Sequence, residues 1–220
     1  MTQLNSIHVS QTQESVISRN KVLRNTYALL SMTLLFSAVC AGVSMALNLP
    51  HPGIILTLVG YFGLLFLTHK FRNQGLGLVF VFALTGFMGY TLGPILNMYM
   101  ANGPGIVMQA FALTGIIFLA LSGYALTSKK DFSFLRSFLM VGILVGFVAA
   151  LAAIFFEIAA LSLAVSAMFV LLMSGLILYE TSQIVHGGET NYISATVTLY
   201  VSIYNLFTSL LHLLGFMSSE

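Results

Sequence analysis

The chain has 220 residues, of which 58% are hydrophobic and 6% are charged, with a formal net charge of +2 and a mean hydropathy of +0.98. A soluble domain usually carries about 25% charged residues, so this composition excludes a soluble globular protein and indicates a membrane protein. The few basic residues exclude a nucleic-acid-binding surface. The single cysteine, Cys40, excludes an intrachain disulfide and a cysteine zinc site.

The first 25 residues are polar and precede the first apolar run. They are rich in Gln, Ser, Thr and Asn and hold few large apolar side chains, which predicts a disordered tail. A secretory signal would instead place its apolar core within the first few residues after a short basic region. The sequence therefore predicts two parts, a tail over residues 1–25 and a membrane domain over residues 26–217.

Seven apolar runs follow the tail, each close to the length of about 20 residues that a membrane-spanning helix needs. In chain order they cover approximately Thr26–Leu47, Gly53–Thr68, Leu76–Met98, Ile106–Leu126, Phe134–Phe156, Leu161–Tyr179 or a little beyond, and Tyr192–Met217. Backbone groups in lipid must bond within their own segment, and runs this long do not fit the short alternating strands of a barrel. The predicted fold is an all-α polytopic membrane protein with seven transmembrane helices.

The basic residues gather on one side of the predicted membrane domain. They lie in the tail and around the second and fourth connections, at Arg19, Lys21, Arg24, Lys70, Arg72, Lys129, Lys130 and Arg136. The positive-inside rule then places the N-terminus in the cytoplasm and, with seven spans, the C-terminus outside. A re-entrant seventh run would instead return the C-terminus to the cytoplasm, and the sixth connection has no Lys or Arg to decide between these two topologies.

The third run contains TGFMGYTLGPILN, in which Gly86, Gly89 and Gly93 share one helix face. Small residues on one face let helix backbones approach closely. Pro94 lacks a backbone donor and predicts a kink, so the carbonyl that it frees and the Asn97 side chain both need partners. The pattern favours a bent, tightly packed structural helix, with a role in a transport pathway as the alternative.

The seventh run carries polar residues at intervals of four, three, four and three. These are Thr198, Ser202, Asn205, Ser209 and His212. Such spacing draws one polar stripe along a helix, and polar side chains in lipid seek partners or water, so this face should point into the bundle. Two interpretations stay open, namely hydrogen bonds between helices and a hydrated pathway.

Glu180 lies in the last turns of the sixth helix, toward the predicted cytoplasmic side. A charge at the bilayer centre costs about 2.5–3.5 kcal/mol on insertion scales, so this carboxyl group must be protonated, paired or hydrated. His69 and Lys70, at the cytoplasmic end of the second run, are its candidate charge partners. The structural alternative is a glutamate near the helix end that reaches headgroup water.

Five stretches carry a resemblance to a known family, from about Lys21 almost to the end of the chain. They are KVLRNTYALLSMTLLFSA, GIILTLVG, TGFMGYTLGPILN, LTSKKDFSFL and ETSQIVHGGETNYISATVTLYVSIYNLF. On these stretches, of which the third and fifth are the specific ones, the chain resembles the Bax inhibitor (TMBIM) family of small membrane proteins. The resemblance implies six helices that surround a central seventh.

The resemblance implies one function as a calcium leak that protonation gates. Members with this activity use two facing acidic side chains on the last two helices, of which Glu180 matches the first and Ser202 stands at the second. Serine cannot share a proton as a second carboxylate would, and it adds no negative charge for a hard cation. This departure argues against calcium binding, and no metal or cofactor is predicted. A proton or cation leak would use Glu180, Ser202, Asn205 and His212.

The resemblance is strongest to a bacterial subgroup whose members bind the membrane-anchored, ATP-dependent protease FtsH, serve as its slow substrates and restrain it. Residues 1–25 would be the handle that the protease grips. The main prediction is therefore a non-enzymatic inner-membrane protein that modulates FtsH in membrane-protein quality control. The runs hold no HExxH, GxSxG or facing aspartate pair that would indicate a hydrolase.

Overall fold

The computed structural model describes the backbone of residues 2–128 and 130–218 and the side chains of residues 17–101, 103–128 and 130–218. Over these described residues the chain forms seven helices and no strand, which confirms the all-α prediction. The helices are α1 (Thr2–Ala46), α2 (Ile54–Lys70), α3 (Gly75–Asn102), α4 (Pro104–Ser128), α5 (Leu135–Phe155), α6 (Ala159–His186) and α7 (Tyr192–Met217).

Six of these helices contain segments long and apolar enough to cross a membrane, by length and composition. The exception is α2, an apolar helix of 17 residues. At 1.5 Å per residue it is about 26 Å long, which is just short of a typical hydrocarbon core of about 30 Å. The prediction of a spanning helix is therefore confirmed for six of the seven apolar runs.

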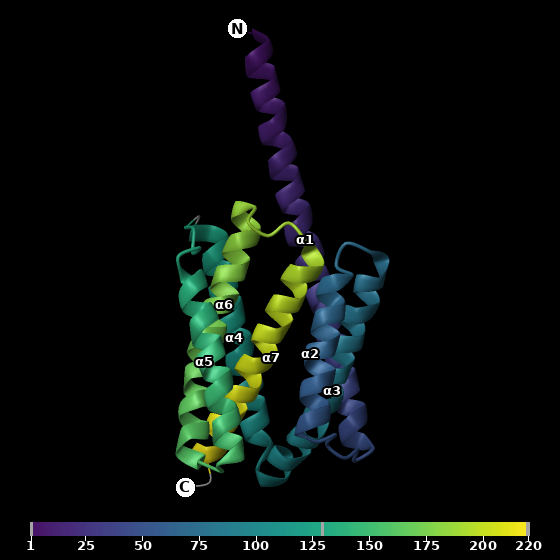
Figure 1. Cartoon of the computed structure of the whole chain (residues 1–220), viewed down its shortest axis with the longest axis vertical. Helices are drawn as coiled ribbons and strands as arrows, with labels where there is room; N and C mark the ends of the chain where they lie inside the picture. Colours follow the sequence, from purple (N-terminus) through teal and green to yellow (C-terminus); the bar gives the residue numbers. More distant parts are fainter. Residues whose placement is uncertain (1, 129, 219–220) are drawn as a thin grey trace.

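The two ends of the bundle differ in charge. The connections α2–α3, α4–α5 and α6–α7 lie at the end from which the first part of α1 projects, and the other connections lie at the opposite end (Figure 1). Every described Lys and Arg residue therefore belongs to the first end, which we call the basic end; Lys129 lies outside the described residues. Because α7 runs as one helix from the basic end to the opposite end, it is not a re-entrant hairpin (Figure 1).

The first part of α1 covers the segment that was expected to be a disordered tail. The helix begins at Thr2 and has no break at residue 25, where the sequence divided tail from membrane domain. This part projects beyond the other helices (Figure 1). The division into a cytoplasmic tail and a membrane domain stays a prediction.

Helices α1 and α3 pack together through the glycine face of α3. A Cβ atom added at Gly89 would lie 2.3 Å from the Ser37 carbonyl oxygen, and one added at Gly93 would lie 2.5 Å from the Ser44 Cβ. Gly86 faces α1 in the same way, where an added Cβ would meet an aromatic ring at 2.8 Å. The predicted close approach of helix backbones along this face is confirmed, because only glycine leaves room for α1 here.

Both groups that were predicted to need partners around Pro94 find them on α1. Pro94 lies inside α3 and lacks an N–H, so it leaves the Tyr90 carbonyl, four residues earlier, without its helical donor. The Ser44 hydroxyl donates to this carbonyl over 3.0 Å. The Asn97 side-chain nitrogen donates to the Met45 carbonyl, near the end of α1, over 3.2 Å. The kink itself stays a prediction.

Helix α7 packs against α1, α2, α3, α4 and α6. Helix α5 packs against α6 and, among the described residues, has no close contact with α7. A central seventh helix surrounded by six others is therefore not confirmed, because α5 reaches the bundle through α6 and through a ring contact of 5.5 Å between its Phe147 and Phe62 of α2. Gly142 of α5 makes that packing close, since an added Cβ there would lie 2.6 Å from a Leu172 methyl group of α6.

Candidate functional site

Glu180 lies on the face of α6 that packs into the bundle. Residues Ile177, Glu180, Thr181 and Ile184 share this face by their spacing, and all four are buried. Both isoleucines are 0% exposed and belong to the main hydrophobic core, together with Leu199 of α7. Glu180 itself is 6% exposed, so its side chain lies mostly within the bundle.

The carboxyl group of Glu180 lacks a partner in the described part of the chain. Its Oε1 atom is buried and accepts no hydrogen bond there. The predicted charge partners His69 and Lys70 have exposed side chains, and no ion pair joins either to Glu180 within the described residues. An uncompensated charge in such a position costs several kcal/mol. The group can therefore hold a proton, or it can take up water or a cation that enters the bundle.

The polar stripe on α7 bonds mainly to its own helix. Thr198, Ser202 and Asn205 each donate a side-chain hydrogen bond to the carbonyl four residues earlier, over 3.1, 2.7 and 2.8 Å. Such bonds satisfy a side chain without a second helix. No hydrogen bond joins Ser202 to Glu180 among the residues that the structure describes. The sequence left two interpretations open for this face, namely hydrogen bonds between helices and a hydrated pathway. The structure shows a third arrangement, in which these three side chains bond to carbonyl groups of α7 itself.

His212 lies far from Glu180. Its Nδ1 atom shares a 2.8 Å hydrogen bond with the hydroxyl of Ser166 on α6. Ser166 precedes Glu180 by 14 residues, which corresponds to about 21 Å along the helix axis. The predicted residues Glu180, Ser202, Asn205 and His212 therefore do not gather into one cluster, and a joint role in a proton or cation site stays a prediction.

The sequence analysis missed a second polar stripe on α7, made by Thr196, Tyr200 and Tyr204 at four-residue intervals. The Tyr200 hydroxyl, in a side chain 1% exposed, donates to the Thr85 carbonyl of α3 over 3.3 Å and shares a 2.6 Å hydrogen bond with Ser37 of α1. Tyr204 bonds a threonine hydroxyl of α3 at 3.3 Å, and Thr196 donates to an α1 carbonyl at 3.2 Å. These bonds fix α7 to α1 and α3. The signal was the regular spacing of the two tyrosines.

Thr181, next to Glu180, joins three helices. Its hydroxyl lies 3.2 Å from the Tyr27 hydroxyl of α1 and 3.5 Å from the Ser122 hydroxyl of α4, and both pairs are hydrogen-bonded. These bonds set the rotation of α6 against α1 and α4. They therefore also set the direction in which the neighbouring Glu180 side chain enters the bundle.

Polar side chains hold the connections at the basic end. The Asn191 side-chain oxygen accepts hydrogen bonds from two N–H groups in the first turn of α7, each at a distance of 3.0 Å. The Asn191 side-chain nitrogen donates to the Arg72 carbonyl at a distance of 3.1 Å. Gln183 donates to the Ser133 hydroxyl over 2.8 Å. Hydrogen bonds from the Ser133 side chain and backbone hold the pKa of Asp131 below its usual value. The connections α2–α3 and α4–α5 are thus tied to α7 and α6.

Comparison with known proteins places this fold in a family. A family model described as "Inhibitor of apoptosis-promoting Bax1" matches residues 19–219. The chain belongs to the Bax inhibitor family. The resemblance found in the sequence is thereby confirmed over nearly the whole chain. With its six long apolar helices, this Bax inhibitor family protein is a multi-pass membrane protein.

Several bacterial proteins are similar to this family member along almost their full length. It is 55% identical over 212 residues to the Escherichia coli K12 protein named "Modulator of FtsH protease YccA", with 96% of this chain and 97% of the relative covered. A second E. coli strain has a protein named "Inner membrane protein YccA" at the same identity and coverage. An uncharacterized Pseudomonas aeruginosa protein is 54% identical over 215 residues, with coverage of 97% and 95%.

Proposed function

We propose that this Bax inhibitor family protein is a non-enzymatic modulator of FtsH. It binds the ATP-dependent membrane protease, is degraded slowly, and restrains the action of the protease on other membrane proteins. The observation that supports this proposal is the 55% identity, over 96% of the chain, to a protein named for modulation of FtsH. The protein then lies in the bacterial inner membrane, with its basic end and N-terminus in the cytoplasm and its C-terminus in the periplasm.

Two parts of the fold would have separate roles in such a modulator, namely the N-terminal segment and the helix bundle. Residues 2–16 belong to the predicted polar tail of residues 1–25, and the first part of α1 projects from the basic end (Figure 1). A polar chain terminus is the kind of segment at which proteolysis starts. We propose that this segment is the handle that the protease grips and that the helix bundle carries the docking surface.

The test uses FtsH and this protein reconstituted together in liposomes. The three chains compared are the full chain, a chain without residues 2–16, and a chain in which a Gly/Ser segment of equal length replaces them. The chain without residues 2–16 should still co-purify with FtsH but should resist degradation. The full chain should slow the degradation of a second membrane substrate. Degradation of the shortened chain at the full-length rate would refute the handle, and failure of every chain to co-purify with FtsH would refute the partner.

One observation favours a second candidate function, a pH-sensitive proton or calcium leak. The Oε1 atom of Glu180 is buried without a hydrogen-bond partner among the described residues, as a site that takes up a proton or cation would require. Ser202 stands where leak-active members of the family have their second acid, so calcium is the less favoured ion.

Liposomes that hold the purified protein test this second function. Proton and calcium flux should exceed that of empty liposomes and should fall in Glu180→Gln. Ser202→Asp, which restores the second acid, should raise the calcium flux and its dependence on pH. Flux equal to that of empty liposomes at every pH would reject the leak and leave the protease proposal unaffected.

A further inference from the structure

A groove opens between α1 and α4 at the basic end. One pocket of about 260 Å³ is lined by Arg19, Asn20, Leu23, Leu126, Ile184 and Val185. A second pocket of about 320 Å³ is lined by Asn20, Leu23, Arg24, Tyr27 and Leu126. Because the two pockets share three lining residues, they form one continuous depression, which we call the α1–α4 groove.

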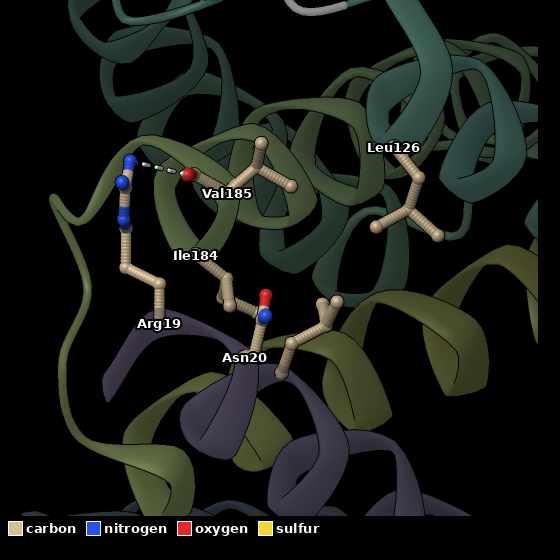
Figure 2. Close-up of a pocket in the computed structure, with 6 residues that line it drawn as sticks. Arg19, Asn20, Leu126, Ile184 and Val185 are labelled. Atoms are coloured by element: carbon tan, nitrogen blue, oxygen red, sulfur yellow. Dashed lines mark hydrogen bonds between the residues drawn. The ribbon is translucent and has the colours of Figure 1, made fainter. Parts of the chain in front are cut away.

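The chemistry of the groove changes along its length. At the rim, Figure 2 shows the Arg19 side chain directed to the Val185 carbonyl, to which it donates a hydrogen bond of 3.5 Å. Arg24 is exposed beside the second pocket and makes no ion pair or hydrogen bond within the described residues. No residue that lines either pocket is acidic in the described chain. The rim is therefore cationic, with a guanidinium group available to an anion.

Below the rim the groove is apolar. Leu23 of α1 and Leu126 of α4 form its walls. Tyr27 lies one turn deeper, where its ring stands 6.2 Å from that of Phe118 and its hydroxyl is already bonded to Thr181. The inner part of the groove thus offers hydrocarbon surface and no polar group that would need water.

The groove lies at the depth of a lipid headgroup. The third candidate span, Pro104–Ser128, ends here, and the described Lys and Arg residues gather at this end of the bundle. Arg19 to Tyr27 covers eight residues, or about 12 Å along α1, which is somewhat less than the ~15 Å half-thickness of a hydrocarbon core. Basic pockets between helices at a membrane surface are known to bind acidic lipid headgroups.

We propose that the α1–α4 groove binds one acidic phospholipid, with the phosphate at Arg24 and the first part of an acyl chain along Leu23, Tyr27 and Leu126. Each pocket is near or below the lower limit of about 300 Å³ for small-molecule sites, so the groove accepts the headgroup and one upper chain segment and leaves the rest of the lipid in the bilayer. Lys21, three residues before Arg24 on the same helix face, adds positive potential at the rim. The proposal depends neither on FtsH nor on ion flux.

The experiment measures lipid binding to the full chain by native mass spectrometry in a neutral detergent. The probes are phosphatidylglycerol, phosphatidylcholine with the same acyl chains, and inorganic phosphate. The variants are Arg24→Gln at the rim and Leu126→Trp, which fills the apolar part. Arg136→Gln is the matched control, because Arg136 is an exposed arginine at the basic end that lines neither pocket.

The wild-type chain and Arg136→Gln should bind phosphatidylglycerol in preference to phosphatidylcholine, with one lipid retained per chain. Arg24→Gln should bind phosphatidylglycerol about fivefold more weakly, which is the effect of one basic residue near an anionic lipid surface. Leu126→Trp should also weaken binding, and its melting temperature shows whether the fold is kept. Equal loss in Arg24→Gln and Arg136→Gln, or equal binding of the two lipids, would overturn the proposal.

Two other outcomes identify a different occupant. Full competition by inorganic phosphate would show that the groove binds a free anion, and the lipid assignment would be wrong. If Leu126→Trp lost FtsH but kept phosphatidylglycerol, the groove would be a protein-docking surface and the lipid proposal would equally fail. Binding of phosphatidylglycerol that fails in Leu126→Trp while FtsH binding persists would support the lipid site and separate it from the protease function.

Discussion

Replacement of Gly89 by alanine tests the close packing of α1 against α3. The added Cβ would lie 2.3 Å from the Ser37 carbonyl oxygen, whereas ordinary van der Waals contact begins at 3.4 Å. The obstacle is backbone and cannot rotate away, so the two helices must separate locally by about 1 Å. A gap of 0.5–1 Å forfeits roughly a quarter to a half of each affected dispersion contact. Small-to-large changes in packed cores cost about 1–3 kcal/mol.

We therefore expect Gly89→Ala to destabilise the protein by about 2 kcal/mol, a midpoint of that range. Chains of this size lose roughly 2–4 °C in melting temperature for each kcal/mol of lost stability, so the melting temperature should fall by about 4–8 °C. Circular dichroism in detergent measures this melting temperature. The reaction of Cys40 with a fluorescent maleimide gives a second readout, because this single cysteine lies beside Gly89 in the same interface.

Gly115→Ala is the matched control, since an added Cβ there meets no atom within 4 Å. In an open helical position alanine is favoured over glycine by about 0.5–1 kcal/mol, so this variant should melt at or slightly above the wild-type temperature. If Gly89→Ala and Gly115→Ala melted alike, α1 and α3 would not be in the close contact described, and the argument from added Cβ atoms would be refuted.

Three further substitutions test single interactions, with melting temperature as the measurement. Ser44→Ala should lower the free energy of unfolding by about 1–2 kcal/mol, because it leaves the Tyr90 carbonyl without a donor. In a Pro94→Ala background the same change should have little effect, because the residue at position 94 then supplies a helical N–H to this carbonyl. If the effects of the two substitutions simply added, the proposed coupling between Ser44 and Pro94 would be wrong. Asn191→Ala should lower the free energy of unfolding by about 1 kcal/mol, because it removes the N-cap of α7. Asn191→Asp keeps the capping oxygen and should lose less stability. Equal losses of stability in the two variants would count against the cap. Glu180→Gln should melt no lower than wild type, because it removes an ionisable group that has no partner among the described residues, and a clear loss would show that a partner exists.

The packing of α1 on α3 could be predicted because its causes lie in local sequence. Gly86, Gly89 and Gly93 share a face by helical geometry alone, and Pro94 must free a carbonyl wherever α3 lies. The end of α6 also has a local cause, because Gly187 adopts a φ of 79° that other residues rarely adopt. The sequence nevertheless placed the end of this run near Tyr179, whereas α6 continues to His186.

Features that depend on how two helices are rotated against each other could not be predicted. Serine and threonine can bond their own helix, so a stripe such as that of Ser202 does not reveal whether it faces a partner. The longer reach of Tyr200 makes it the residue that bonds across, and its spacing was the overlooked signal. The pairing of Glu180 with Lys70 stays a prediction, because shared depth in a membrane does not set the angle between two helices. The position of α5 was hidden because apolar side chains look alike whether they face lipid or protein.

The contacts of α7 have a consequence for biogenesis. The ribosome delivers this helix last, yet it touches α1, α2, α3, α4 and α6. Until it enters the bilayer, hydroxyls and carbonyls on the earliest helices, such as Ser37 and the Thr85 carbonyl, lack the tyrosine that joins them. The joining of α1 to α3 through Tyr200 therefore waits for α7, and a chain interrupted before Tyr192 lacks both of these bonds.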